Sequence, residues 1–258
     1  MELNRRQFVN MATGSVATSL LSGIVPAVGG SGLAIKAIAF DGFTTFDPRS
    51  VFALAEQLFP GRGAELSNVW RTRQFEYTWL RTVFGRYADF WKVTEDALVF
   101  AGKTLKLELS PEQRQRLMQA YLELKSYPDV LPALKSLREA GIRLAFLSNM
   151  TPHMLDSAIK SSGLEGIFEP SLSTDRVRVY KPDPRAYQMG IDAFTLKREE
   201  IVFAAFGGWD AAGAKLFGYP TFWVNRLNLP IEELGGAPDA IGENLADLVD
   251  FVRARQQL

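Results

Sequence analysis

The residue best placed for chemistry is Asp41, which directly follows the apolar run Ala37-Ile-Ala-Phe40. This run is too short for a helix and is followed at once by Gly42, so it predicts a buried strand that ends in a carboxylate. In open α/β sheets, reactive groups gather beyond the carboxyl ends of the strands. We interpret Asp41 as a candidate nucleophile; the alternative is a carboxylate that only caps a turn or helix.

Other polar residues are expected at the same edge of the predicted sheet. They are Thr45, Ser148, Asn149, Lys181 and Asp210. A carboxylate nucleophile can form an ester with an electrophilic carbon or phosphorus, and Lys181 would keep it ionised. Ser148 and Asn149 would donate hydrogen bonds to a substrate carboxylate or an oxyanion. Asp210 would orient or deprotonate a water molecule.

Each of these residues also has a purely structural interpretation. Thr45 and Ser148 could be turn residues. Asn149 and Asp210 could each cap the helix that follows them. Lys181 could be an exposed turn lysine, because lysine is mostly found at the surface.

Composition narrows the chemistry further. The 258 residues are 47% hydrophobic and carry 29 basic and 29 acidic side chains, with no long basic block, so we expect no nucleic-acid partner. The absence of cysteine excludes disulfides, thiolate metal sites and cysteine nucleophiles. His153 is the only histidine, which leaves little for a Ser-His-Asp triad or a histidine metal site. We interpret it as a surface residue.

The N-terminal residues 1–32 are predicted to be an export signal and linker. Arg5-Arg6 precede an apolar, small-residue stretch from about Met11 to Val28, which is typical of a twin-arginine signal. Such a signal implies the twin-arginine translocase as a partner and a periplasmic location. The alternative is a plain N-terminal extension. Pro26 and the Gly, Ser and Thr residues interrupt the stretch too often for a membrane span.

The remaining chain divides by pattern. Apolar spacing in residues 47–127 predicts helices and no strands, at about 51–59, 65–86, 94–105 and 111–125. From residue 128, predicted helices (130–140, 152–162, 185–194, 211–217) alternate with strands (143–147, 171–172, 201–206, and 220–224 as the last). This alternation predicts an α/β fold with a parallel sheet. We expect a Rossmann-like core from residues 33–46 and 128–258, with 47–127 inserted after the first strand as a helical cap.

Several phrases, taken together, resemble the haloacid dehalogenase superfamily, and within it the type II (L-2-haloacid) dehalogenases. The phrases are Phe40-Asp41 with Thr45, Phe59-Pro-Gly-Arg-Gly63, Trp70-Arg71, Glu76-Tyr-Thr-Trp-Leu-Arg81, Leu147-Ser-Asn149, Val179-Tyr-Lys-Pro-Asp183 and Trp209-Asp210. The resemblance runs from about residue 35 to 248. Arg71 and the phrase from Glu76 to Arg81 indicate the type II subgroup, because phosphatases of the superfamily do not share them.

The resemblance implies a role for each site residue. Asp41 would be the nucleophile, Lys181 would hold it ionised and Asp210 would position the hydrolytic water. Arg71, from the cap, would accept the departing halide; by itself it could equally be a surface arginine of a helix. Thr45, Ser148 and Asn149 would orient Asp41 and bind the substrate carboxylate, and Tyr187 would assist at the carboxylate or halide side. The apolar lining would consist of Phe43, Phe75, Phe90 and Trp209.

The activity implied by the resemblance is hydrolysis of a small (S)-2-haloalkanoic acid to the inverted 2-hydroxy acid through an ester on Asp41. No cofactor or metal is expected, because Phe43 occupies the position of the second aspartate of superfamily phosphatases. A homodimer is a further expectation. Ala205 and Gly207 stand where dehalogenases usually carry Ser and Asn. Two alternatives stay open: the same ester chemistry on another small acid, such as a strained-ring amino acid, and a catalytically weakened exported protein that binds small carboxylates.

Overall fold

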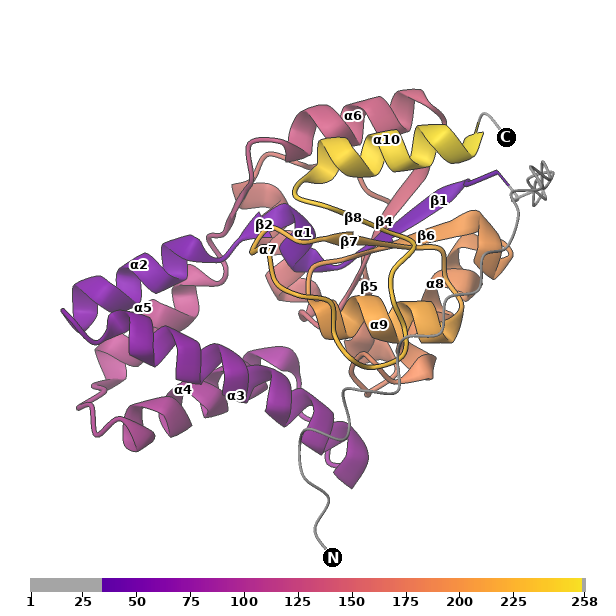
Figure 1. Ribbon diagram of the computed structural model, residues 1–258. Helices are drawn as coiled ribbons and strands as arrows, with labels where there is room; N and C mark the ends of the chain where they lie inside the picture. The colour runs from indigo at the N-terminus through magenta and orange to yellow at the C-terminus, as the bar shows by residue number, and fades with distance from the viewer. Residues whose placement is uncertain (1–33, 257–258) are drawn as a thin grey trace, which may run out of the picture. The chain divides into compact units, whose positions relative to one another are not determined.

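The computed structural model describes residues 34–256, so the predicted export signal lies outside the described residues. Its main feature is a six-stranded parallel sheet in the order β5-β4-β1-β6-β7-β8 (Figure 1). The strands are β1 (Ala37–Phe40), β4 (Arg143–Ser148), β5 (Leu172–Ser173), β6 (Ile201–Ala205), β7 (Thr221–Val224) and β8 (Ala240–Gly242). The predicted parallel α/β sheet is confirmed. β1 lies between β4 and β6, so the residues after these three strands meet at one edge of the sheet.

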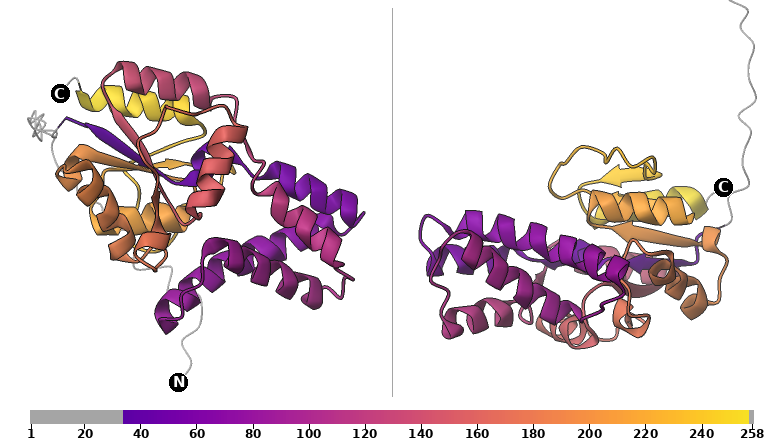
Figure 2. Two further views of the ribbon diagram at one scale, coloured as in Figure 1. Left: turned by 180° about the vertical axis from the view of Figure 1, so that it is seen from behind. Right: turned by 90° about the horizontal axis from the view of Figure 1, so that it is seen from below.

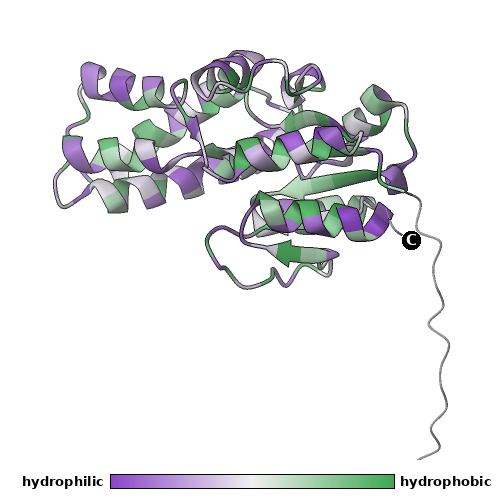
Figure 3. Cartoon of the chain, turned by 90° about the horizontal axis from the view of Figure 1, so that it is seen from above, coloured by the Kyte–Doolittle hydropathy of each residue, from purple (hydrophilic) through white to green (hydrophobic). Residues whose placement is uncertain are grey.

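Helices cover both faces of the sheet. The helices α6 (Val130–Glu139), α7 (Pro152–Ser161) and α10 (Leu245–Gln256) bury apolar side chains in one cluster, and α8 (Pro184–Phe194) and α9 (Gly208–Phe217) in another. Within β1 the side chains alternate between these clusters: Ile38 and Phe40 join the first, Ala37 and Ala39 the second. Figure 3 shows the result, with hydrophobic strands between helices that carry both hydrophobic and hydrophilic residues.

A second group of helices follows β1. The short helix α1 (Gly42–Thr45) leads into β2 (Phe46–Asp47), and the chain returns through β3 (Lys125–Ser126). Between them lie α2 (Arg49–Leu58), α3 (Gly63–Phe84), α4 (Phe90–Thr104) and α5 (Pro111–Ala120), which Figure 2 shows packed together. We call α2–α5 the cap. The limits of 47 and 127 given to the cap stay a prediction.

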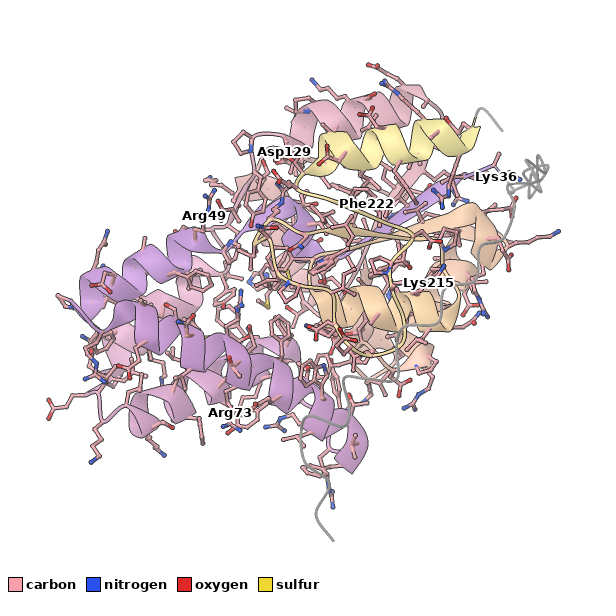
Figure 4. All side chains as sticks on the ribbon, viewed as in Figure 1. Lys36, Arg49, Arg73, Asp129, Lys215 and Phe222 are labelled. Atoms are coloured by element: carbon pink, nitrogen blue, oxygen red, sulfur yellow. The ribbon has the colours of Figure 1, made fainter. Side chains whose placement is uncertain are left out.

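The junction between the cap and the sheet is tied by Arg226, which follows β7. Its Nη2 atom donates to the carbonyl oxygen of Thr44 at 2.9 Å and pairs with Asp129 Oδ2 at 2.8 Å. Its guanidinium also lies 3.9 Å from the ring centroid of Tyr127. Figure 4 labels Asp129 and, at the start of α2, Arg49 near this junction. These contacts fix α1, and therefore the turn that follows β1, against the core.

The structure corrects several predicted elements. β2 and β3 pair antiparallel inside the region expected to lack strands, because two residues are too few to show alternation. α4 begins at Phe90, four residues before the predicted start at 94, because Asp89 caps the helix by accepting a hydrogen bond from the Lys92 amide. α5 ends at Ala120 rather than 125. The strand near 220–224 is not the last one, because β8 and then α10 follow it. The 3₁₀ turns Thr174–Arg176 and Arg198–Glu200 are further elements that were not predicted. No helix within residues 34–256 is long and apolar enough to cross a membrane.

Candidate active site

Asp41 leaves β1 and caps α1 at the same time. Its Oδ1 atom accepts a hydrogen bond from the Phe43 amide at 2.9 Å, and Thr44 Oγ1 donates to the Asp41 carbonyl at 2.7 Å. The two interpretations of Asp41, strand-end carboxylate and helix cap, therefore hold together. The helix-capping hydrogen bond from the Phe43 amide fixes one carboxylate oxygen and orients the Asp41 side chain, which is about 11% exposed.

Lys181 lies behind Asp41 and joins it to Asp210. Its Nζ atom is 2.8 Å from Asp41 Oδ2 and 2.6 Å from Asp210 Oδ2, and its side chain is fully buried. Burial alone would lower the pKa of Lys181, but the carboxylates of Asp210 and Asp41 raise it above its usual value. The ammonium therefore stays charged between the two carboxylates. The alternative of an exposed turn lysine is wrong.

Asp210 is held in the first turn of α9 and does not cap that helix. α9 begins at Gly208, three residues earlier than predicted, and its N-cap residue is Gly207. Tyr187 donates its hydroxyl to Asp210 Oδ1 at 2.7 Å, while Lys181 holds Oδ2. Burial raises the pKa of the Asp210 carboxyl to about 6. An ionised Asp210 can therefore accept a proton near neutral pH.

Ser148 and Asn149 end β4 beside Asp41. Ser148 Oγ accepts from the Met150 amide at 3.2 Å, as a turn residue does. Asn149 Oδ1 accepts from the Lys181 amide at 3.1 Å. Asn149 therefore links the residues after β4 to the segment that carries Lys181, and it does not cap α7. Thr151 caps α7 instead. The amide nitrogen of Asn149 has no hydrogen-bond partner in the described chain and can donate to an anion.

The core and the cap enclose a cavity of about 260 Å³ around these groups. The predicted site residues that line it are Asp41, Phe43, Arg71, Phe75, Phe90, Ser148, Asn149, Trp209 and Asp210. Trp209 packs on Phe75 at 5.4 Å and on Trp79 at 5.3 Å between ring centroids, which makes one wall aromatic. Across residues 34–256, Arg71 has no hydrogen-bond or ion-pair partner, so its guanidinium is available to an anion in the cavity.

Three of the predicted site residues lie outside the cavity lining. Lys181 reaches the site from behind, as described above. Tyr187 was expected beside the substrate. Its ring instead packs on Phe203, and its hydroxyl donates a hydrogen bond to Asp210, so Tyr187 orients that carboxylate. Thr45 was expected to orient Asp41, yet among the described residues its hydroxyl meets only Thr44 Oγ1, at 3.4 Å. It is Thr44 that bonds to Asp41.

The cavity also has lining residues that the sequence analysis missed. They are Thr72, Glu76, Trp79, Met150, Phe206, Gly207, Gly208, Leu227, Leu229 and Glu232. Thr72, Glu76 and Trp79 are spaced as one face of α3 together with Arg71 and Phe75, so helical periodicity could have found them. No periodic signal marks Leu227, Leu229 or Glu232, which lie in the loop after β7.

A metal site was not expected here. In the part of the chain that the structure describes, no group of three or more His, Cys, Asp or Glu side chains is arranged to hold a metal ion. At the catalytic edge, the position two residues after Asp41 carries the apolar Phe43, which lines the cavity and supplies no ligand.

Comparison with known proteins places this geometry in a family. The family model for haloacid dehalogenase-like hydrolases matches residues 34–218. The (S)-2-haloacid dehalogenase of Pseudomonas sp. (strain YL) is 45% identical over 206 residues, which cover 80% of this chain and 89% of that protein. The crystal structure of the L-2-haloacid dehalogenase RSc1362 is similar with a TM-score of 0.84 at 45% identity, covering 85% of this chain and 99% of that one.

A further solved relative contains a covalently bound ligand. It is the L-2-haloacid dehalogenase from Xanthobacter autotrophicus with chloropropionic acid covalently bound, which is 36% identical with a TM-score of 0.79. The match covers 85% of this chain and 98% of that chain. With its parallel sheet, its strand-end carboxylate and these relatives, the chain belongs to the haloacid dehalogenase-like hydrolase family.

Proposed function

We propose that this protein is an (S)-2-haloacid dehalogenase that converts a small (S)-2-haloalkanoic acid to the inverted 2-hydroxy acid. The observation that carries the proposal is a strand-end carboxylate, Asp41, which is ion-paired to the buried Lys181 and lines a largely apolar cavity. Arg71 of the cap lines the same cavity and has no hydrogen-bond or ion-pair partner among residues 34–256. The names of the relatives support it, since these are (S)-2-haloacid or L-2-haloacid dehalogenases.

In the first step, a carboxylate oxygen of Asp41 attacks C2 of the substrate and forms an ester while the carbon–halogen bond breaks. Attack from the face opposite the halogen inverts C2. The departing halide moves to Arg71, whose guanidinium is not neutralised by another side chain of the described residues. Asn149 is placed to donate from its free amide to the substrate carboxylate. The covalently bound chloropropionic acid in the Xanthobacter relative supports an ester intermediate.

In the second step, water hydrolyses the ester at the carboxyl carbon of Asp41. Asp210 is the base, because it lines the cavity and its pKa of about 6 leaves it ionised at neutral pH. Tyr187 holds Asp210 through Oδ1, and Lys181 holds it through Oδ2. The bond between Asp41 and the ester oxygen breaks, and the 2-hydroxy acid leaves.

The experiment is halide release from L- and D-2-chloropropionate, each with and without excess EDTA. We expect release from the L enantiomer only, at the same rate with chelator. A phosphatase assay with p-nitrophenyl phosphate and Mg²⁺ is the control. Magnesium-dependent phosphate release without halide release would overturn the proposal, because it requires a metal site that the Phe43 position does not offer.

We further propose that the protein is exported by the twin-arginine translocase to the periplasm. Arg5-Arg6 and the apolar stretch that follows support this. A homodimer stays a prediction.

A further inference from the structure

The loop between β7 and β8 lines one side of the cavity, and its first residues are anchored to the core. Leu227, Leu229 and Glu232 of this loop line the cavity. Asn225 closes the start of the loop on itself: its Nδ2 atom donates to the Leu229 carbonyl at 2.8 Å, and its Oδ1 atom accepts from the Leu229 amide at 3.0 Å. Together with the contacts of Arg226 at the junction, these bonds hold the first part of the loop, residues 225–229, against the core.

Glu232 reaches from this loop onto the turn between β6 and α9. A β-carbon added to Gly208 would lie 2.8 Å from Glu232 Cγ and 3.2 Å from Glu232 Oε1. The Glu232 side chain therefore lies directly on the Gly208 backbone, in space that only a glycine leaves open. Gly207, the neighbouring residue, also lines the cavity and has no side chain to offer. The indole nitrogen of Trp209 lies over Gly207, 2.8 Å from where a β-carbon would be, and the Glu232 carboxylate lies over Gly208. Glu232 is thus the acidic group on this turn, and Gly208 lies two residues before Asp210.

Glu232 also differs from the other carboxylates of the cavity in being unengaged. Both oxygens of Asp41 and both oxygens of Asp210 accept hydrogen bonds from protein groups. Glu76 is paired with Arg73, whose Nη1 atom is 2.8 Å from Glu76 Oε2. Glu232 has no hydrogen-bond or ion-pair partner within residues 34–256, and its side chain is exposed. Its oxygens are free to bind water at the cavity wall.

We propose that Glu232 binds and orients the water that hydrolyses the ester on Asp41, an inference that rests on the proposed function. The water oxygen forms a bond to Asp41 Cγ while one water proton passes to Asp210. The bond between Cγ and the ester oxygen then breaks, and the leaving alkoxide takes the proton from Asp210. Asp41 is left as a carboxylic acid and loses its proton to solvent. Glu232 accepts a hydrogen bond from the water throughout, which fixes the direction of attack.

The test separates the two steps by rapid mixing of enzyme with L-2-chloropropionate. Halide release reports ester formation, and intact mass of quenched samples reports the ester on Asp41. We expect Glu232→Gln to lengthen the ester lifetime about tenfold, because a neutral amide oxygen accepts a hydrogen bond more weakly than a carboxylate does, and to leave the first halide turnover unchanged. The matched control is Glu233→Gln, which removes an equal charge from an exposed neighbour outside the cavity lining.

A second variant displaces Glu232 without altering it. In Gly208→Ala the new methyl group occupies the place of Glu232 Cγ, so the ester lifetime is expected to lengthen as in Glu232→Gln. If both act through the same water, the double variant is no slower than the slower single variant. Far-ultraviolet circular dichroism checks that each variant is folded.

The outcomes distinguish the two proposals. Equal ester lifetimes in Glu232→Gln and Glu233→Gln would overturn the role of Glu232 and leave the dehalogenase intact. Halide release with no ester in either the wild type or Glu232→Gln would do the same, because hydrolysis would not then depend on Glu232. No halide and no ester in the wild type would instead overturn the proposed function itself.

Discussion

At the scale of single residues, the site is organised by one buried ammonium. Lys181 is fully buried, and a lone buried charge would be strongly unfavourable, but two carboxylates lie within 2.8 Å of its Nζ atom. The same contacts hold the nucleophile Asp41 and the base Asp210 in one fixed arrangement. Removing the Asp41 carboxylate should stop ester formation, whereas removing the Asp210 carboxylate should stop ester hydrolysis, so the two roles can be separated by experiment.

The first prediction concerns Asp41→Asn. The asparagine oxygen can still accept from the Phe43 amide and cap α1, so we expect the fold to be retained. Turnover should fall by at least about 10³-fold, because the neutral amide is not a nucleophile. Dehalogenation by the variant and single turnover of the wild type in ¹⁸O water are the measurements. Label that enters only the product, and not the Asp41 carboxylate, on the first turnover would contradict a covalent mechanism.

The second prediction concerns pH. Asp210 has a pKa of about 6 in the folded protein, against an ordinary value of 3.8 for an aspartate side chain. Ester hydrolysis needs the ionised form, so its rate should fall as the pH decreases. The midpoint should lie below the free-enzyme value of about 6, because the ester removes the Asp41 charge that helps to raise the pKa of Asp210. Stability has the opposite sign for this group: the folded state binds the proton more tightly, so the stabilising contribution is complete below about pH 4 and is lost as the pH rises through 6.

The measurement for this second prediction is the decay of the ester between pH 4.5 and 8, with halide release followed in parallel. Tyr187→Phe is the informative variant, since it removes the hydroxyl that bonds to Asp210 Oδ1 and should move the midpoint upward. A midpoint identical in wild type and Tyr187→Phe would assign the titration to another group.

At the scale of elements, the placement of Arg71 depends on how closely α3 packs on α2. Gly63, the first residue of α3, has no room for a side chain: a β-carbon there would lie 2.2 Å from the Cα atom of Glu56. The two helix backbones therefore touch. α3 also carries Phe75 and Trp79, which line the cavity. A shift of the first turn of α3 would therefore also move these two side chains.

The third prediction follows from this contact. Gly63→Ala must push α2 and α3 apart, and we expect a loss of about 3 kcal/mol in the free energy of unfolding, the upper range for overpacking. Urea unfolding followed by tryptophan fluorescence measures it. Gly102→Ala in α4 is the control, because its β-carbon would meet Leu109 at an ordinary 3.5 Å and the change should be small. Equal stability of the two variants would show that the α2–α3 contact relaxes freely.

At the scale of the whole molecule, the catalytic cavity exists only because the cap and the core meet. The core supplies Asp41, Asn149 and Asp210, and the cap supplies Arg71 and the aromatic wall. Arg226 lies at the junction between the cap and the core, where it donates a hydrogen bond to the Thr44 carbonyl, close to the nucleophile in sequence. The proposed halide site and the nucleophile are therefore set by the same junction.

The fourth prediction concerns export of the whole chain. In a Gram-negative host, the protein should reach the periplasm, and Arg5→Lys with Arg6→Lys should block this, because the translocase reads the arginine pair. Fractionation with immunodetection measures it. Retention of the wild-type protein in the cytoplasm, with the paired lysine variant indistinguishable from it, would remove the signal interpretation.

Much of the architecture was readable from local patterns. Strand periodicity and helix signals need only neighbouring residues, so β1, β4, β6 and α8 could be predicted within a residue or two. Short elements without such patterns were missed, namely β2, β3 and β8. α10 was missed as well, since its apolar residues are diluted by charged ones.

What the sequence determined by itself is the inventory: a carboxylate after the first strand, candidate partners after later strands, and an insertion that carries Arg71. What only the tertiary structure decided is which of them touch. Lys181 bonds to Asp41 across 140 residues of sequence, and Arg226 bonds to the Thr44 carbonyl across 182. Such contacts depend on strand order and helix packing, which no local pattern encodes. For the same reason Tyr187 lies behind Asp210, and Glu232 lies on Gly208.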